Sequence, residues 1–187
     1  MHIADNILPS PATNGNGTVS GDYVTRAAKK RALQSSKIPE SWRLTPVPAV
    51  EDAVDALQYI RTSGKLTAEE LEITETTDAA ALVKKLATGA LSSVQVVSAF
   101  AKRAAIAHQL TICCTELFFD EALEDAKRLD EVFAQTGKPV GPLHGLPISI
   151  KDSVDVKGQD TSLGISSSTQ CMVREMLIQN MQDGLVW

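Results

Sequence analysis

The sequence holds 187 residues, of which 43% are apolar, 22% charged and 4% aromatic, and its formal net charge is −5. A chain of this size can bury roughly 70% of the surface that it exposes on unfolding, and this composition is typical of soluble globular proteins. The acidic balance without a basic stripe disfavours nucleic-acid binding. No stretch approaches the roughly 18 apolar residues of a membrane span, and no basic leader precedes an apolar run. We therefore expect a soluble protein whose ligands are small molecules or proteins.

The cysteines give no sign of a disulfide framework or a zinc site. There are three, Cys113, Cys114 and Cys171, so the count is odd, two are adjacent, and the spacing is not that of metal ligands. Without a leader or a disulfide framework, a reducing, cytoplasmic compartment is the expected location.

The first part of the chain is predicted to contain little packed structure. Residues 1–21 are rich in Asn, Gly, Pro, Ser and Thr without a hydrophobic period, which predicts a disordered tail. Residues 22–66 are predicted to form an N-terminal helix and an extended arm. Asp22 is the expected cap of that helix, whose basic face is expected to be solvated and which must end before Pro39. The arm contains the motif IPESWRL, with Trp42 as its expected anchor.

From Thr67 the sequence is predominantly helical in pattern. Thr67 and Glu70 form a capping-box pattern that opens a short helix, and a second such pattern begins at Ser92. Apolar residues then recur every three or four positions, with Asp120 as the expected cap of the last helix. Glycines close two of these segments in positions that suit a left-handed conformation. The expected helices cover residues 78–88, 93–109 and 120–135.

The periodicity changes after a run rich in glycine and proline. Leu146, Ile148 and Ile150 alternate with more polar positions, which predicts a β-strand over residues 146–151. Helices ahead of a first strand indicate an α/β domain of which only the opening is present. Lys151 ends this strand, and burial would lower the pKa of its ammonium group and make it a candidate general base. The alternative is a surface lysine paired with Asp152 or Asp155.

The segment GPLHGLPISIKDSVDVKGQDTSLG resembles the opening of amidase-signature enzymes, in which a strand ends in the catalytic lysine. IPESWRLT, KLTAEELEITETTDAAALVKKLATG, FAKRAAIAHQLT and FFDEALEDAKRLDEVFAQTGKPVGPLHGLP are similar to successive segments of fungal acetamidase-type amidases. The resemblance covers residues 38–164. It implies an N-terminal helical layer that leads into the first strand of the mixed sheet of the amidase-signature fold, with residues 67–165 as the start of the amidase domain.

The resemblance implies a hydrolase with an unusual catalytic triad. A serine attacks the amide carbonyl, and a lysine takes its proton through a second serine in a cis peptide, so that carboxylate and ammonia are released. Lys151 matches the lysine of this triad. The implied partner is a small-molecule amide, no cofactor or metal is implied, and the full-length family suggests a possible homodimer. His144 is expected to shape the turn before the strand, and Asp152 to accept backbone hydrogen bonds in the following loop.

The resemblance ends before the two serines. The family's Gly-Ser-Ser-Gly-Gly type of segment is not found, and Ser166, Ser167 and Ser168 lack flanking glycines and follow Lys151 too closely to replace it. Residues 166–187 are an atypical C-terminal tail that contains three of the chain's four methionines. The chain is therefore expected to be an incomplete, inactive copy of an amidase.

Two other functions are open at this stage. One is an amidotransferase A-subunit-like fragment, because that subfamily shares the lysine strand, although IPESWRL favours the acetamidase type. The other is a non-catalytic helical interaction module. A large exposed apolar patch on the helices between Thr67 and Gln135 would favour the module.

Overall fold

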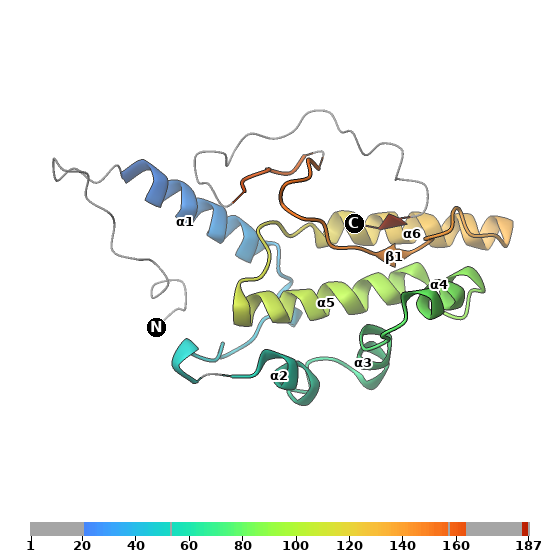
Figure 1. Ribbon diagram of the computed structural model, residues 1–187, viewed down its shortest axis with the longest axis horizontal. Helices are drawn as coiled ribbons and strands as arrows, with labels where there is room; N and C mark the ends of the chain where they lie inside the picture. The colour runs from blue at the N-terminus through green and yellow to red at the C-terminus, as the bar shows by residue number, and fades with distance from the viewer. Residues whose placement is uncertain (1–20, 53, 157, 164–184, 187) are drawn as a thin grey trace.

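The computed structural model describes residues 21–52, 54–156, 158–163 and 185–186. The long helix α5, Ser93–Thr111, lies at the centre and runs beside α6, Phe119–Thr136 (Figure 1). The shorter helices α2, Ala56–Thr62, and α3, Ala68–Thr74, pack along another side of α5. Helix α4, Ala79–Ala87, follows α3 and contacts the strand β1.

The capping patterns in the sequence are present at two helix starts. The Thr67 side chain accepts from the Glu70 amide at 3.1 Å, and the Glu70 carboxylate accepts from the Thr67 amide at 2.7 Å. Ser92 and Gln95 make the same reciprocal pair ahead of α5. Each box pairs amides that a helix start leaves without partners, which explains why these two boundaries were predictable.

The boundaries of α4 and α6 also agree with those predicted from the sequence, except for the residue that caps the start of α6. Asp78 caps α4, and Gly89 and Gly137 have φ angles of 70° and 65° just after α4 and at the end of α6. The prediction that Asp120 caps α6 is wrong: Phe118 is the N-cap, without a side-chain hydrogen bond, and Asp120 lies in the first turn. The acidic side chain still sits at the positive end of the helix dipole.

The core is built around α5, which contributes to every buried apolar cluster in the described residues. One cluster joins α5 to the loop before α6, and another joins α5 to α3 and α4. A third joins α5 to α6, and the fourth joins α5 to α2 and the arm. Ala99, Ala105 and Ile106 are completely buried, so α5 has apolar contacts on more than the single predicted stripe. The α5 residues in these clusters are Val96, Val97, Ala99, Ala101, Ala105 and Ile106.

The N-terminal region is more helical than its sequence suggests. Helix α1, Gly21–Ser36, begins one residue before Asp22, so Asp22 is not its cap. Short 3-10 turns, η2 at Glu40–Trp42 and η3 at Val50–Asp52, interrupt the arm, and α2 lies within the part predicted to be extended. Asp55 caps α2 by accepting from two of its amides, a signal that the sequence analysis overlooked.

Trp42 anchors the arm as predicted. Its ring packs edge-on against Phe119 with 5.7 Å between ring centroids, beside the buried Ile38. The arm is held further by Gln109, which accepts from the Leu44 amide and donates to the Trp42 carbonyl.

The predicted strand is present only in part. Strand β1 comprises Leu146–Pro147 and pairs in parallel with β2, Leu185–Val186, as a two-residue ladder. The prediction that the strand continues to residue 151 is wrong, because Ile148–Lys151 has no ladder partner among the described residues. The described fold is therefore mostly helical, and an α/β sheet is not seen within it.

Several sequence predictions concern residues outside the described ones. These are the disordered tail (all but residue 21), the trio Ser166 to Ser168, and most of the atypical tail 166–187. Across residues 21–52, 54–156 and 158–163, no helix combines the length and the apolar character that crossing a bilayer would take.

Candidate active site

An open cleft of about 860 Å³ lies where the segment after β1 passes the helices. One wall is the face of α5 that carries Val97, Phe100, Ala101 and Ala104. The second wall is the loop from Cys113 to Phe118 with the start of α6, and the third is the chain from Pro147 to Asp160. The polar groups on these walls are Thr115, Glu116, Ser149, Lys151, Asp152, Gln159 and Asp160.

Lys151 lines this cleft but is not buried. Its side chain is exposed, and Ile148 and Ile150 before it are only half-buried. The expectation of a lysine desolvated by a buried strand is therefore wrong for the described residues, because no further strand covers Ile148 and Ile150 there. The alternative pairing also fails: within the described residues Lys151 forms no ion pair with Asp152 or Asp155.

Asp152 holds the loop that follows Lys151, as the sequence predicted. Its carboxylate accepts from the Ser162 amide at 3.3 Å and from the Ser162 hydroxyl at 2.9 Å. Asp155 accepts from the Thr161 hydroxyl at 2.8 Å. The two aspartates thus fold residues 152–162 back on themselves beside the cleft, which fixes the direction in which the chain leaves Lys151.

His144 has the contacts of a structural histidine. It is 3% exposed, its Nδ1 accepts from the Val140 amide at 3.2 Å, and its Nε2 lies 3.5 Å from the Ser93 hydroxyl. Burial lowers the pKa of His144, and the charge of Asp130 opposes this effect only partly. His144 does not line the cleft. The turn role expected from the sequence therefore agrees with the geometry.

A cation from α1 pairs with two carboxylates that line the cleft. Lys30 bridges the carboxylates of Glu116 and Asp160, the second at 2.8 Å. Burial acts to lower the pKa of Lys30, but its hydrogen bonds to Asp160 and Glu116 outweigh burial and raise it. The basic face of α1 was predicted to be solvated, and for Lys30 that prediction is wrong: the ion pairs attach α1 to the cleft.

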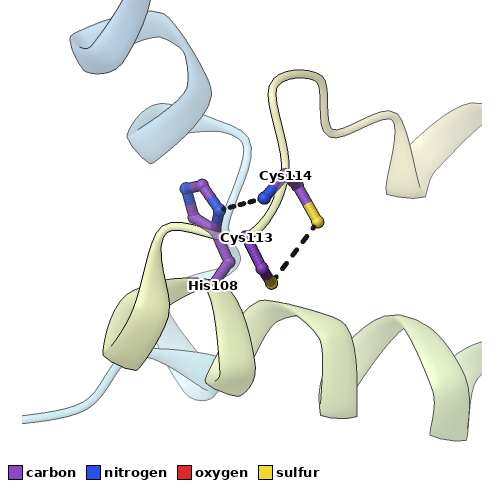
Figure 2. A group of neighbouring side chains, drawn as sticks. All are labelled: His108, Cys113 and Cys114. Atoms are coloured by element: carbon purple, nitrogen blue, oxygen red, sulfur yellow. Dashed lines mark hydrogen bonds between the residues drawn. The ribbon is translucent and has the colours of Figure 1, made fainter. Parts of the chain in front are cut away.

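A group that the sequence did not predict includes two residues of the second wall, Cys113 and Cys114. Figure 2 shows His108, at the end of α5, against the adjacent cysteines Cys113 and Cys114. Cys114 donates its amide to His108 Nδ1 at 3.3 Å, and the two sulfur atoms are 3.8 Å apart. The available signal was a histidine five and six residues before two cysteines, across a helix end.

Comparison with known proteins gives a consistent family signal. Residues 95–172 match the model of the Amidase family. The chain is 52% identical over 141 residues to an acetamidase of Emericella nidulans, which covers 75% of this chain and 25% of that protein. It is 49% identical over 140 residues to an amidase of Gibberella moniliformis, which covers 73% of this chain and 26% of that protein.

A solved structure is similar as well. A fatty acid amide hydrolase superimposes with a TM-score of 0.79 at 36% identity, over 87% of this chain and 30% of that one. The chain therefore spans about a quarter of the length of the curated relatives that it matches.

Proposed function

We propose that this chain, which belongs to the amidase family, is part of a hydrolase that converts a small linear carboxamide into a carboxylate and ammonia. The observation that carries the proposal is the 52% identity to an acetamidase over 141 residues, which includes three quarters of the chain. The similarity to a fatty acid amide hydrolase supports amide hydrolysis without selecting the acyl group. We place the enzyme in the cytoplasm, and a homodimer is an expectation for the complete protein.

Within that reaction, the proposed role of Lys151 is to accept a proton. A lysine that works as a base must be neutral, which requires a setting shielded from water. Lys151 is exposed in the described residues, so the rest of an amidase would have to supply the cover. A serine hydroxyl placed between Lys151 and the nucleophile would relay the proton, and backbone amides would stabilise the oxyanion.

The proposal predicts that this chain is catalytically incomplete. The purified 187-residue chain should release no ammonia from acetamide or benzamide above background, and Lys151→Ala should leave that result unchanged. A version extended through the serine-rich segment and the remainder of an acetamidase should be active. In that version Lys151→Ala should lower the rate at least about a hundredfold, the low end of general base catalysis. The assay is ammonia release under saturating amide.

The control is Lys138→Ala in the extended version, because Lys138 is also exposed but does not line the cleft. It should keep full activity. An inactive but folded extended version would contradict amide hydrolysis. Turnover by the short chain, abolished by Lys151→Ala, would show that hydroxyls already present serve the reaction. Ser149, Ser153 and the trio Ser166 to Ser168 would be the first to test.

The helical interaction module receives less support. Between residues 67 and 135, Ile112 is the one large apolar side chain in the described structure that is clearly exposed, at 43%. A docking helix layer would present several such side chains on one face. Apolar surface is instead gathered inside the cleft beside Lys151.

A further inference from the structure

The chain brings three soft or borderline ligands together where α5 ends. One ligand atom from each of His108, Cys113 and Cys114 lies within 4.8 Å of the others. Figure 2 shows both cysteines on the segment that leaves the helix, with the imidazole turned toward the Cys114 backbone. None of these side chains has a part in the proposed amide hydrolysis.

An unusual backbone conformation creates this arrangement. Ile112 ends α5 in the left-handed region, with φ 52° and ψ 43°, and its amide donates to the His108 carbonyl at 2.8 Å. A β-branched residue rarely adopts this conformation, because its Cβ approaches the backbone closely. The turn brings the next two residues back over the last turn of the helix. Cys113 and Cys114 therefore lie beside a histidine that precedes them by five and six residues.

The segment that carries the cysteines is held firmly on its other side. Cys114 packs against the buried cluster that contains Ile38 and Leu117. The buried Gln34 side chain of α1 accepts from the Leu117 amide and donates to Glu116, each at 2.7 Å. The position of Cys114 is therefore fixed by the core, whereas Cys113 is exposed to solvent.

The sulfur positions suit one tetrahedral cation. Two metal–sulfur bonds of about 2.3 Å at a tetrahedral angle place the sulfur atoms about 3.8 Å apart. The Cys113 and Cys114 sulfur atoms are 3.8 Å apart. A nitrogen at about 2.0 Å from the same cation would lie about 3.5 Å from each sulfur. The three ligand atoms already lie within 4.8 Å of one another, so the imidazole nitrogen is at most about 1.3 Å farther from either sulfur than one shared cation requires.

The histidine is prepared for such a role, and the cysteines must be ionised. His108 is half-buried at the end of α5, and its imidazole must be neutral to bind a metal. Its Nδ1 accepts from the Cys114 amide, so that its lone pair already faces the cysteine segment. Burial and the neighbouring Cys113 raise the pKa of the Cys114 thiol to about 12. A cation must therefore displace this proton, as thiolate ligation always requires.

We propose that His108, Cys113 and Cys114 bind one thiophilic cation of the Zn²⁺ type, with a fourth position left for water or a small ligand. Two S–H bonds lose their protons to solvent, two metal–sulfur bonds form, and the imidazole Nδ1 gives its lone pair. The amide of Cys114 gives up its bond to Nδ1. Three protein ligands with an open fourth position are the arrangement of catalytic zinc sites, whereas structural zinc sites are closed.

The purified 187-residue chain is first reduced with a reagent that contains no thiol. Co²⁺ and then Zn²⁺ are added to it. Co²⁺ should bind at one equivalent, with a thiolate-to-cobalt charge-transfer band and the intense visible bands of tetrahedral cobalt. Zn²⁺ should displace it. Cys113→Ser and Cys114→Ser should each abolish the charge-transfer signal or weaken metal binding at least about tenfold. His108→Gln should weaken metal binding by about ten- to a hundredfold, the range found for changes around other metal sites.

The matched controls are Cys171→Ser and His2→Gln, which remove the remaining cysteine and a histidine of the terminus. Both should bind as the parent does, and far-UV circular dichroism of all variants should match the parent. The proposal would be overturned by cobalt binding without a charge-transfer band, by binding that Cys171→Ser removes, or by no binding by the reduced chain. Loss of two hydrogens on mild oxidation, with no metal binding before it, would instead identify a Cys113–Cys114 disulfide and also overturn it.

Discussion

At the scale of single residues, the turn before β1 depends on a glycine that has no room for a side chain. Gly145 has a φ angle of 72°, and a Cβ there would lie 2.4 Å from the Ser93 hydroxyl and 2.9 Å from the Ser93 Cβ. Ser93 is 1% exposed and begins α5, so it cannot move aside cheaply. The close approach also places His144 next to the start of α5.

Gly145→Ala is therefore expected to be strongly destabilising. The left-handed conformation alone costs an alanine about 1–2 kcal/mol, and the clash with Ser93 adds a similar amount, so we expect about 2–4 kcal/mol in the free energy of unfolding. Urea unfolding followed by circular dichroism measures it. Gly64→Ala is the control: its φ is 68°, yet no heavy atom lies within 4 Å of the added Cβ. If the two variants lose equal stability, the clash contributes nothing.

Residues that act through their neighbours along the chain were predictable, and those that depend on distant packing were not. Asp152 as a loop acceptor follows from its local position after a strand. The exposure of Lys151 does not, because it depends on which strands cover Ile148 and Ile150. The group of His108 and the two cysteines also escaped the sequence, since it needs the left-handed turn at Ile112.

At the scale of elements, α6 supplies a cap to α5. Asp130, in the fourth turn of α6, accepts from the Ser93 amide at 2.7 Å and from the Val94 amide at 3.0 Å. These are the first amides of α5, which have no partner within the helix. The carboxylate also lies at the positive end of the α5 dipole. One side chain thus joins the two longest helices at a fixed register.

We expect Asp130→Ala to lower the free energy of unfolding by about 2–4 kcal/mol, because it removes two charge-assisted hydrogen bonds and leaves the amide of the buried Ser93 unpaired. Asp125→Ala serves as the comparison on the same helix. Asp125 makes an exposed ion pair with Arg128 at 3.3 Å, and its loss should cost no more than about 0.5 kcal/mol. Thermal and urea unfolding of both variants give the answer; similar losses would mean that the cap is energetically unimportant.

The elements that the sequence predicted best are those whose boundaries have local chemical signals. Capping boxes and glycines located α3, α4 and α5, and both ends of α6 came within a few residues. Helix α2 was missed because it is short and follows the proline-rich part of the arm, all of which was predicted to be extended. The length of the strand was overestimated, because alternation of apolar and polar residues indicates only that one face is buried. A strand forms only where a partner strand supplies the hydrogen-bond ladder.

At the scale of the whole molecule, apolar surface lies in the cleft between α5, the cysteine-bearing loop and the segment after β1. Phe100, Ile148 and Ile150 face this space and are only partly buried. In a complete amidase we expect additional strands to continue the ladder that β1 begins and to cover these side chains. The half-burial of Ile148 and Ile150 and the exposure of Lys151 then have one cause, because no further strand covers this segment among the described residues.

This gives a prediction that does not depend on catalysis. A neutral solvatochromic dye should bind the 187-residue chain with blue-shifted fluorescence, because the cleft of about 860 Å³ is open and largely apolar. Ala104→Phe, which places a ring into the cleft from α5, should reduce the signal, whereas Ala87→Phe, on α4 and away from the cleft, should not. The extended version described above should show little dye binding, because its added strands occupy the same surface. If both versions are folded by circular dichroism and show equal fluorescence, the cleft stays open in the complete enzyme. The shielding proposed for Lys151 would then have to come from bound substrate.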